Sequence, residues 1–158
     1  MSDTERQAIE DVLLDYCERV DAGDVDAVVA LFTDDATIDY GYGRRIQGHA
    51  ALTEFFGERL IATYRATSHH LSNVRIAVDG DRATARSYAY AWHERHDGTQ
   101  AHVWGRYADV LVRSDSGWRI AERTIRAAGS AGFPTPDGRS PFELITRAGR
   151  QPAGGGPS

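Results

Sequence analysis

The 158-residue chain is long enough to bury a core as one domain, and its 41% hydrophobic and 26% charged residues are typical of a globular protein. The net charge of −5 argues against nucleic acid as the main partner, and no apolar run approaches the roughly 20 residues of a membrane helix. All 18 basic residues are Arg, which excludes Schiff-base and phosphate-loop lysines, and neither GxxxxGK[ST] nor GxGxxG occurs. We therefore expect no nucleic-acid partner, no membrane partner and no nucleotide cofactor.

The first part of the chain is predicted to be mainly helical. Apolar residues recur at helical spacing, and the predicted helices span residues 4–20, 25–32 and 50–63. Asp3 or Thr4 is the expected N-cap of the first helix, which should stop near Gly23, and Asp24 is the expected N-cap of the second. Residues 36–42, between the second and third helices, are β-rich and end in Gly-Tyr-Gly.

The second part of the chain has the pattern of a β-meander. The predicted strands span residues 68–78, 83–94, 100–113 and 118–127. Turn sequences rich in Asp, Gly and Ser separate them. Helices followed by an antiparallel meander predict an α+β fold.

The composition changes near the C-terminus, where Gly, Pro, Ser and Arg dominate. The expected parts are a folded domain over residues 1–128, a C-terminal extension over 129–150 and a disordered tail over 151–158. The apolar residues of the extension that could dock over a pocket mouth are Phe142, Leu144 and Ile145.

The N-terminal sequence and the cysteine content favour a cytoplasmic location. The first residues are acidic and polar, without the basic start and apolar stretch of a signal peptide. The single Cys17 cannot form an internal disulfide or a thiolate metal site.

Asp21 stands at an unfavourable place for a carboxylate. It follows Val20 at the C-terminal end of the first helix, where the helix dipole disfavours negative charge by roughly 0.3–1 kcal/mol. A solvated Asp in a turn is the structural alternative to a catalytic role. Tyr16, five residues earlier, is expected to face the core with a hydroxyl that needs a partner.

Two adjacent histidines, His69 and His70, lie on a predicted strand, so only one of them can face a pocket. Alternation groups His70 with the apolar positions that follow it, which favours His70 as the inward residue. A bulge near Ser72 would reverse that order. Either residue could be structural, but His is the usual proton-transfer group near neutral pH.

Further residues suit substrate binding. His93 fits a second acid–base group or a substrate ligand, and fits equally a surface histidine at a strand end. Alternation places Arg123 beside Ala121 and Ile125, where it either faces inward to bind an anionic or carbonyl oxygen or lies on an exposed face. The aromatic residues that could line a pocket for an apolar, ring-bearing substrate are Tyr40, Phe55, Phe56, Tyr88, Tyr90, Trp92 and Trp104.

Several stretches of the chain resemble the SnoaL-like branch of the NTF2-like superfamily. They lie within residues 4–128 and include Tyr-Cys-Glu-Arg-Val-Asp-Ala-Gly-Asp-Val-Asp-Ala, Gly-His-Ala-Ala-Leu, Ser-His-His-Leu-Ser-Asn, Gly-Arg-Tyr-Ala-Asp and Gly-Trp-Arg-Ile-Ala-Glu-Arg. The resemblance implies a cone in which a curved antiparallel sheet wraps around three N-terminal helices. It also implies a homodimer, or a higher homo-oligomer, formed through the sheet.

Within this family the chain is similar to scytalone dehydratase, bile acid 7α-dehydratase and hexachlorocyclohexane dehydrochlorinase. In the last two, the catalytic Asp precedes the catalytic His by the interval that separates Asp21 from His69. The resemblance therefore selects His69 over its neighbour. It also implies a catalytic Tyr at Tyr16 and an active-site Arg at Arg123.

One position departs from the family pattern. A further acidic residue of the bile acid enzyme falls near Trp92 or His93, whereas scytalone dehydratase has a second histidine in this region that His93 could supply. This departure leaves the substrate and the leaving group open.

The reaction that these residues favour is a lyase or dehydratase reaction on a small apolar molecule, cyclic or polyketide-like. Asp21 would orient His69, which would remove a proton next to a carbonyl group, without a metal or organic cofactor. A polyketide cyclase or double-bond isomerase would share the proton abstraction. A ligand-binding or assembly domain without catalysis is the third alternative, because this fold hosts many functions.

Overall fold

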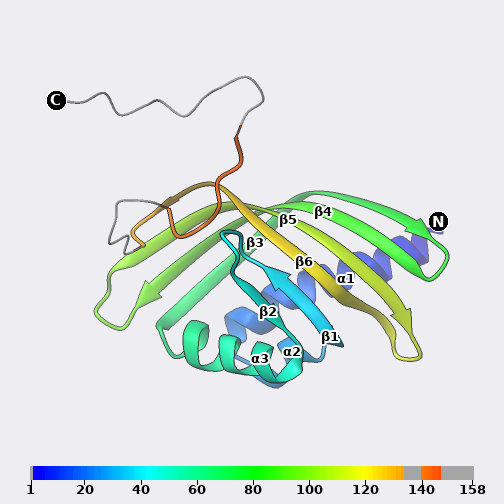
Figure 1. Cartoon of the computed structure of the whole chain (residues 1–158), viewed down its shortest axis with the longest axis horizontal. Coiled ribbons are helices and arrows are strands. Elements are labelled where there is room, and N and C mark those ends of the chain that lie inside the picture. The colour runs from blue at the N-terminus through cyan, green and yellow to red at the C-terminus, as the bar shows by residue number, and fades with distance from the viewer. Residues whose placement is uncertain (1, 134–139, 147–158) are drawn as a thin grey trace.

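A strongly curved sheet of six strands forms the wall of a cone around the helices (Figure 1). The computed structural model describes residues 2–133 and 140–146. The strands are β1 (Phe32–Asp39), β2 (Arg45–Gln47), β3 (Tyr64–Asp79), β4 (Arg82–Arg95), β5 (Gln100–Ser114) and β6 (Gly117–Ala131). Their spatial order is β2-β1-β6-β5-β4-β3, so the four long strands form the predicted meander.

The predicted α+β cone is confirmed, but its sheet is mixed rather than wholly antiparallel. β1 pairs antiparallel with β2 and parallel with β6, where Ile38 lies opposite Arg123. Parallel pairing needs a long connection between the two strands. Here the whole of the chain between β1 and β6 supplies it.

Helix α1 (Asp3–Ala22) lies along the inner face of the sheet (Figure 1). Its N-cap is Ser2, whose hydroxyl accepts a hydrogen bond from the Glu5 amide at 3.1 Å, so the predicted cap at Asp3 or Thr4 was wrong. Asp3 and Thr4 already lie inside the helix, so Ser2 is the residue whose side chain accepts from the free amides of the first turn. The helix ends at Gly23, which has φ +73°, as the sequence predicted.

The other helices are shorter than predicted. Helix α2 (Val25–Val29) has the predicted cap, since the Asp24 carboxylate accepts from the Ala27 amide at 3.0 Å. It stops early because Phe32 already begins β1, the strand expected only from residue 36. The predicted third helix is divided into helix α3 (His49–Glu54) and the π-helix η1 (Phe55–Ile61).

An irregularity in β3 decides which side chains face inward. The register between β3 and β4 shifts between Ser72 and Arg75, and Asn73 has a left-handed φ of +52°. The bulge changes the alternation of the strand, so that Val74 and His69 can both face the inside although they differ by an odd number of positions. The bulge that the sequence analysis considered near Ser72 is therefore present.

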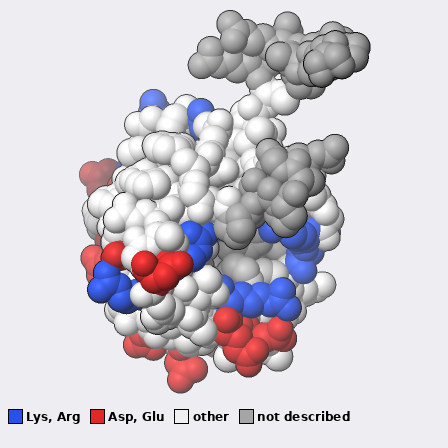
Figure 2. All heavy atoms as spheres, turned by 90° about the vertical axis from the view of Figure 1, so that its left-hand side faces the viewer, with Lys and Arg blue, Asp and Glu red and all other residues white. Residues whose placement is uncertain are grey.

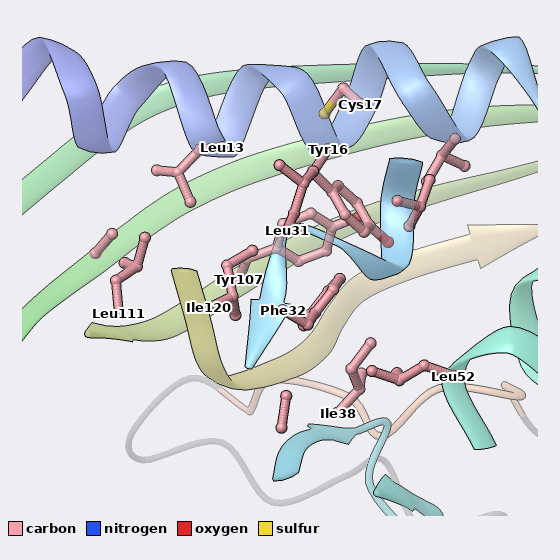
Figure 3. Packing of buried hydrophobic residues seen from close by; sticks show 14 of the residues in the cluster. Leu13, Tyr16, Cys17, Leu31, Phe32, Ile38, Leu52, Tyr107, Leu111 and Ile120 are labelled. Carbon is pink, nitrogen blue, oxygen red and sulfur yellow. The ribbon is translucent and has the colours of Figure 1, made fainter. Parts of the chain in front are cut away.

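The main core lies between α1, the inner face of the sheet and α3 (Figure 3). Tyr16 of α1 contacts Phe32 of β1 and Tyr107 of β5 edge to face, with ring centroids 6.1 and 6.2 Å apart. Each large apolar side chain buried here stabilises the fold by about 1.5–3 kcal/mol. In the part of the chain that the structure describes, no helix is long and apolar enough to cross a membrane.

Candidate active site

A cavity of about 580 Å³ opens between the inner face of the sheet, helix α1, the π-helix and the C-terminal segment. Its size lies within the range of small-molecule sites. Of the residues predicted to form a site, those that line it are Tyr16, Tyr40, Phe55, His69 and His93. Phe142, which was expected to dock over a pocket mouth, also lines it, together with Phe133.

His69 lines this cavity and is paired with Asp21, which lies outside the lining. Nδ1 of His69 lies 2.7 Å from Oδ1 of Asp21, and the backbone amide of His69 donates to Oδ2 at 2.8 Å. Thr67 donates its hydroxyl to Oδ1 at 2.8 Å. The carboxylate at the end of α1 is therefore fixed by three donors from β3.

This geometry sets the protonation of the pair. Burial works to raise the pKa of Asp21, but the hydrogen bonds from His69 and Thr67 outweigh burial and hold the pKa below its ordinary value. An ionised Asp21 requires the proton of neutral His69 to sit on Nδ1, which leaves Nε2 as the basic nitrogen. The His69 side chain is only 6% exposed, so this nitrogen works in a sheltered place.

His93 is a second histidine in the same cavity. Its ring centroid lies 5.5 Å from that of His69, with the two planes at 83°. Burial and the neighbouring His69 lower the pKa of His93 to about 4, so its imidazole is neutral at pH 7. Its Nδ1 is buried without a hydrogen-bond partner among the described residues, which leaves it free for an oxygen atom of a ligand.

Tyr16 lies beside His69, with ring centroids 6.4 Å apart. Burial raises the pKa of Tyr16 to about 12, although the Arg123 cation opposes the shift. The phenol therefore stays protonated at neutral pH and can donate a hydrogen bond.

Arg123 faces inward but does not line the cavity. Its guanidinium is fully buried between the rings of Tyr16 and Tyr107, at 4.1 and 4.5 Å from their centroids. It donates two hydrogen bonds to Asp109, at 2.7 and 3.0 Å. Burial opposes its charge, but Asp109 outweighs burial and raises the pKa of Arg123. The structure therefore does not bring Arg123 into the cavity lining, where the expected direct contact with a substrate would need it.

The sequence analysis did not predict the partner of Arg123. Asp109 stands opposite Arg123 in the register of β5 and β6, in the middle of two strands. The sequence signal that could have revealed this ion pair is an Asp and an Arg at opposite positions of two neighbouring strands. Thr67 was missed as well, because its contact with Asp21 joins residues far apart in the chain.

Five of the seven aromatic residues expected to bind substrate do not line the cavity. Tyr88, Trp92 and Trp104 lie outside its lining, and Tyr88 and Trp104 are 43% and 48% exposed. The alternation of β4 buries its small residues, such as Ala89 and Ala91, because helix α1 and the cavity occupy the inner side. Phe56 is fully buried in the core instead.

Tyr90 follows the same alternation as Tyr88 and lies outside the cavity lining. Its hydroxyl lies 2.8 Å from Nδ1 of His102. The ring of His102 in turn stacks on Trp104, with an interplanar angle of 13°. The large aromatic residues of the meander therefore form a separate group rather than a substrate pocket.

The C-terminal segment is held against the sheet by main-chain pairing. Ala127 donates to the Glu143 carbonyl at 2.9 Å and accepts from the Ile145 amide at 2.8 Å. Leu144 and Ile145 are 46% and 40% exposed, so Phe142 alone of the three apolar residues lines the cavity. The expected tail over residues 151–158 lies outside the described residues.

Metal ligands are not gathered in this site. Within residues 2–133 and 140–146, no group of three or more His, Cys, Asp or Glu side chains could hold an ion. The pair of adjacent histidines is split between the two faces, since His70 is exposed and bonds Ser68 at 2.8 Å.

A curved sheet that wraps around helices and encloses a cavity has the architecture of an NTF2-like protein. The SnoaL-like domain matches residues 3–124, and the chain belongs to this family. A provisionally named scytalone dehydratase of Novosphingobium aromaticivorans is 28% identical, with a TM-score of 0.83 over 92% of this chain and 95% of that one.

Two further relatives show how little the family fixes the reaction. A provisionally named aromatic ring hydroxylase of Novosphingobium aromaticivorans is 32% identical, with a TM-score of 0.80 over 84% of this chain and 96% of that one. An uncharacterized protein of Mycobacterium tuberculosis is 29% identical over 124 residues, which are 76% of this chain and 83% of that one. These descriptions name different activities or none, so the chemistry must be argued from the site.

Proposed function

We propose that the protein is a cofactor-independent lyase of the dehydratase type, in which His69 is the general base. The observation that carries the proposal is the 2.7 Å contact between His69 Nδ1 and Asp21 Oδ1 at the wall of an open cavity. Asp21 holds the imidazole in the tautomer that leaves Nε2 basic, and it stabilises the imidazolium that forms. Such general-base catalysis contributes about 10²–10⁴-fold to a rate.

The reaction needs a carbon acid next to a carbonyl group and a hydroxyl group on the neighbouring carbon. Nε2 of His69 takes the proton, and the electrons of the C–H bond form an enolate. The enolate then collapses to an alkene as the hydroxide departs, and the imidazolium returns its proton to that hydroxide as water. Atoms and charge balance without a further reactant.

Tyr16 suits the enolate oxygen as a neutral hydrogen-bond donor. His93 suits a hydroxyl group of the substrate as a neutral acceptor, because its one N–H is engaged by the backbone of Ala101. His93 is neutral at pH 7 because its pKa is about 4, and Tyr16 is protonated because its pKa is about 12. Both line the cavity beside His69. Preorganised donors at a developing oxyanion are among the largest contributors to catalysis. Arg123 acts in this scheme through Tyr16, whose ring it supports from the core side.

The substrate class follows from the lining. Tyr40, Phe55 and Phe142 give the cavity an apolar, ring-binding wall, and its volume suits a small cyclic or polyketide-like molecule. Side chains do not fill this cavity, and His69 lines it, which favours an enzyme over an assembly domain.

The test is turnover of a panel of cyclic β-hydroxyketones by the purified protein. We expect a product that has lost water, and a loss of about 10²–10⁴-fold in kcat for His69→Gln and Asp21→Asn. His70→Gln is the matched control, because this neighbouring imidazole is exposed and lies outside the cavity lining. Full turnover in both site variants would overturn the assignment.

A polyketide cyclase or double-bond isomerase is the second candidate, because it uses the same proton abstraction. The product then keeps the mass of the substrate. Mass spectrometry of the same reactions therefore separates the two candidates, and an unchanged mass with the same dependence on His69 would favour the second.

We also propose that the protein forms a homodimer through the outer face of its sheet. The exposed aromatic residues Tyr88 and Trp104 lie there, and Arg106 stacks over Tyr88 at 3.6 Å from the ring centroid. Aromatic residues and Arg are typical of protein interfaces. Analytical ultracentrifugation should show a dimer, and a monomer at all concentrations would contradict this.

A further inference from the structure

The cavity combines an aromatic interior with a positively charged mouth, although the whole chain has a net charge of −5. Its charged lining residues are Arg44, Arg45, Arg59 and Glu54. Figure 2 shows arginine side chains on opposite sides of a hollow on this end of the molecule. Arg59 is paired with Glu54 at 3.4 Å, so the other two arginines carry the excess charge.

Among the described residues, Arg44 is held in place by uncharged partners. It lies in the turn between β1 and β2, where its Nη2 donates to the carbonyl oxygens of Pro141 and Tyr40. Its guanidinium also lies 5.9 Å from the centroid of the Tyr40 ring. All of these partners are uncharged, and its Nε and Nη1 have no hydrogen-bond partner among the described residues.

Arg45 has no carboxylate within ion-pair distance in the described part of the chain. Asp39 stands opposite Arg45 in the register of β1 and β2. That carboxylate is engaged by Arg126 at 3.2 Å, and it also accepts from the Gly41 amide at 2.7 Å. Asp39 therefore forms its ion pair with Arg126 rather than with Arg45, although the charge of Arg45 also helps to lower the pKa of Asp39.

We propose that the cavity takes a substrate with a carboxylate attached to its ring system, and that Arg44 and Arg45 receive this carboxylate at the mouth. The proposal rests on the proposed function, since it assigns the substrate class of that same site. The ring contacts Tyr40 and Phe55 inside, and its reacting carbon faces His69. Arg binds carboxylates by paired, charge-assisted hydrogen bonds, which neutral ligands cannot match.

The test compares two probes of the same shape, 2-naphthoate and the neutral 2-naphthamide, by isothermal titration calorimetry on the full chain. We expect 2-naphthoate to bind at least about tenfold more tightly, which corresponds to a charge-assisted hydrogen bond. The preference should shrink as salt is raised, because the mouth is open to solvent. Equal binding of the two probes, or no binding of either, would overturn the proposal.

Substitutions of the two arginines test whether the carboxylate of 2-naphthoate binds at the cavity mouth. Arg44→Gln and Arg45→Gln should each reduce the preference, and the double variant should abolish it while 2-naphthamide binds as before. Arg86→Gln is the matched control, because Arg86 is exposed on β4, outside the cavity lining. A preference lost in Arg86→Gln, or kept in the double variant, would contradict the assignment.

His69→Gln separates this inference from the proposed function. The preference should survive in this variant, since the carboxylate lies at the mouth. If His69→Gln loses the preference for 2-naphthoate over 2-naphthamide while the arginine variants keep it, the carboxylate binds at His69. That result would overturn the inference. If the preference follows the arginines but no proton abstraction depends on His69, the inference stands and the proposed reaction falls.

Discussion

Two acid–base pairs tie the parts of this fold together, and their surroundings differ. Asp109 and Arg123 are both fully buried, with two hydrogen bonds between them and tyrosine rings on either side. Asp21 and His69 are joined by a contact of the same length, but the Asp21 side chain is 26% exposed and His69 lines a cavity. Equal distances therefore do not mean equal roles. The closed pair fixes charge in the core, and the open pair leaves a basic nitrogen for the proton abstraction that we propose.

The largest expected effect comes from breaking the closed pair. Asp109→Asn leaves the Arg123 guanidinium buried without a counter-charge, so the free energy of unfolding should fall by about 3–5 kcal/mol. Urea denaturation at pH 7 measures this loss. Asp21→Asn, at the partly exposed pair, should cost clearly less. Equal losses in the two variants would remove the distinction between a structural and a catalytic pair.

The next effect concerns the neutral histidine beside the open pair. The pKa of His93 is about 4 in the folded protein and 6.5 in an unfolded chain. Between these values the unfolded chain binds a proton that the folded protein does not, so stability falls as the pH is lowered. Full loss corresponds to about 3–4 kcal/mol. His93→Phe should flatten the stability between pH 7 and pH 4, whereas an unchanged slope would contradict a neutral His93.

Thr67 offers a smaller and more selective test of the open pair. Thr67→Val keeps the shape of the side chain but removes one hydrogen bond to Asp21, which is worth about 1 kcal/mol or about fivefold in kcat. KM should not change, and the pKa of Asp21 should rise toward its ordinary value. Thr84→Val, at an exposed position of β4, serves as the control. A change in KM alone would argue against a positioning role for Thr67.

The smallest expected effect on catalysis is at the outer face. Trp104→Ser removes an exposed aromatic residue that lies outside the cavity lining, so kcat/KM should stay within about twofold of the original. The same variant should weaken the proposed dimer, as sedimentation would show. A large loss of kcat/KM with an unchanged association state would restore Trp104 as a substrate ligand.

Much of the fold could be predicted because its signals are local. Helical spacing, the Asp24 cap and the stop at Gly23 depend on neighbouring residues, as do the turns that separate the long strands. The parallel pairing of β1 with β6 could not be predicted, because it joins segments far apart in the chain. The early start of β1 at Phe32 likewise depends on its pairing with Ile120.

Which histidine belongs to the candidate site depends on the bulge in β3, and the sequence alone could only offer that bulge as an alternative. Simple alternation selected His70, and only the irregular backbone at Asn73 turns His69 inward. Most of the aromatic residues expected to bind substrate lie outside the cavity lining, because the expectation counted large side chains without asking which face of the sheet they share. Arg44 and Arg45 were missed because their surroundings depend on the C-terminal segment and on Arg126, which no local pattern reveals.

Hydrogen–deuterium exchange at carbon tests the central claim most directly, because it detects proton abstraction whatever group departs. Cyclic ketones with acidic C–H bonds are incubated with the protein in D₂O, and deuterium at the carbon next to the carbonyl is followed by NMR. We predict exchange catalysed by the original protein and by His70→Gln, and exchange at the background rate for His69→Gln and Asp21→Asn. Equal exchange by the original protein and His69→Gln would contradict the assignment of His69 as the base.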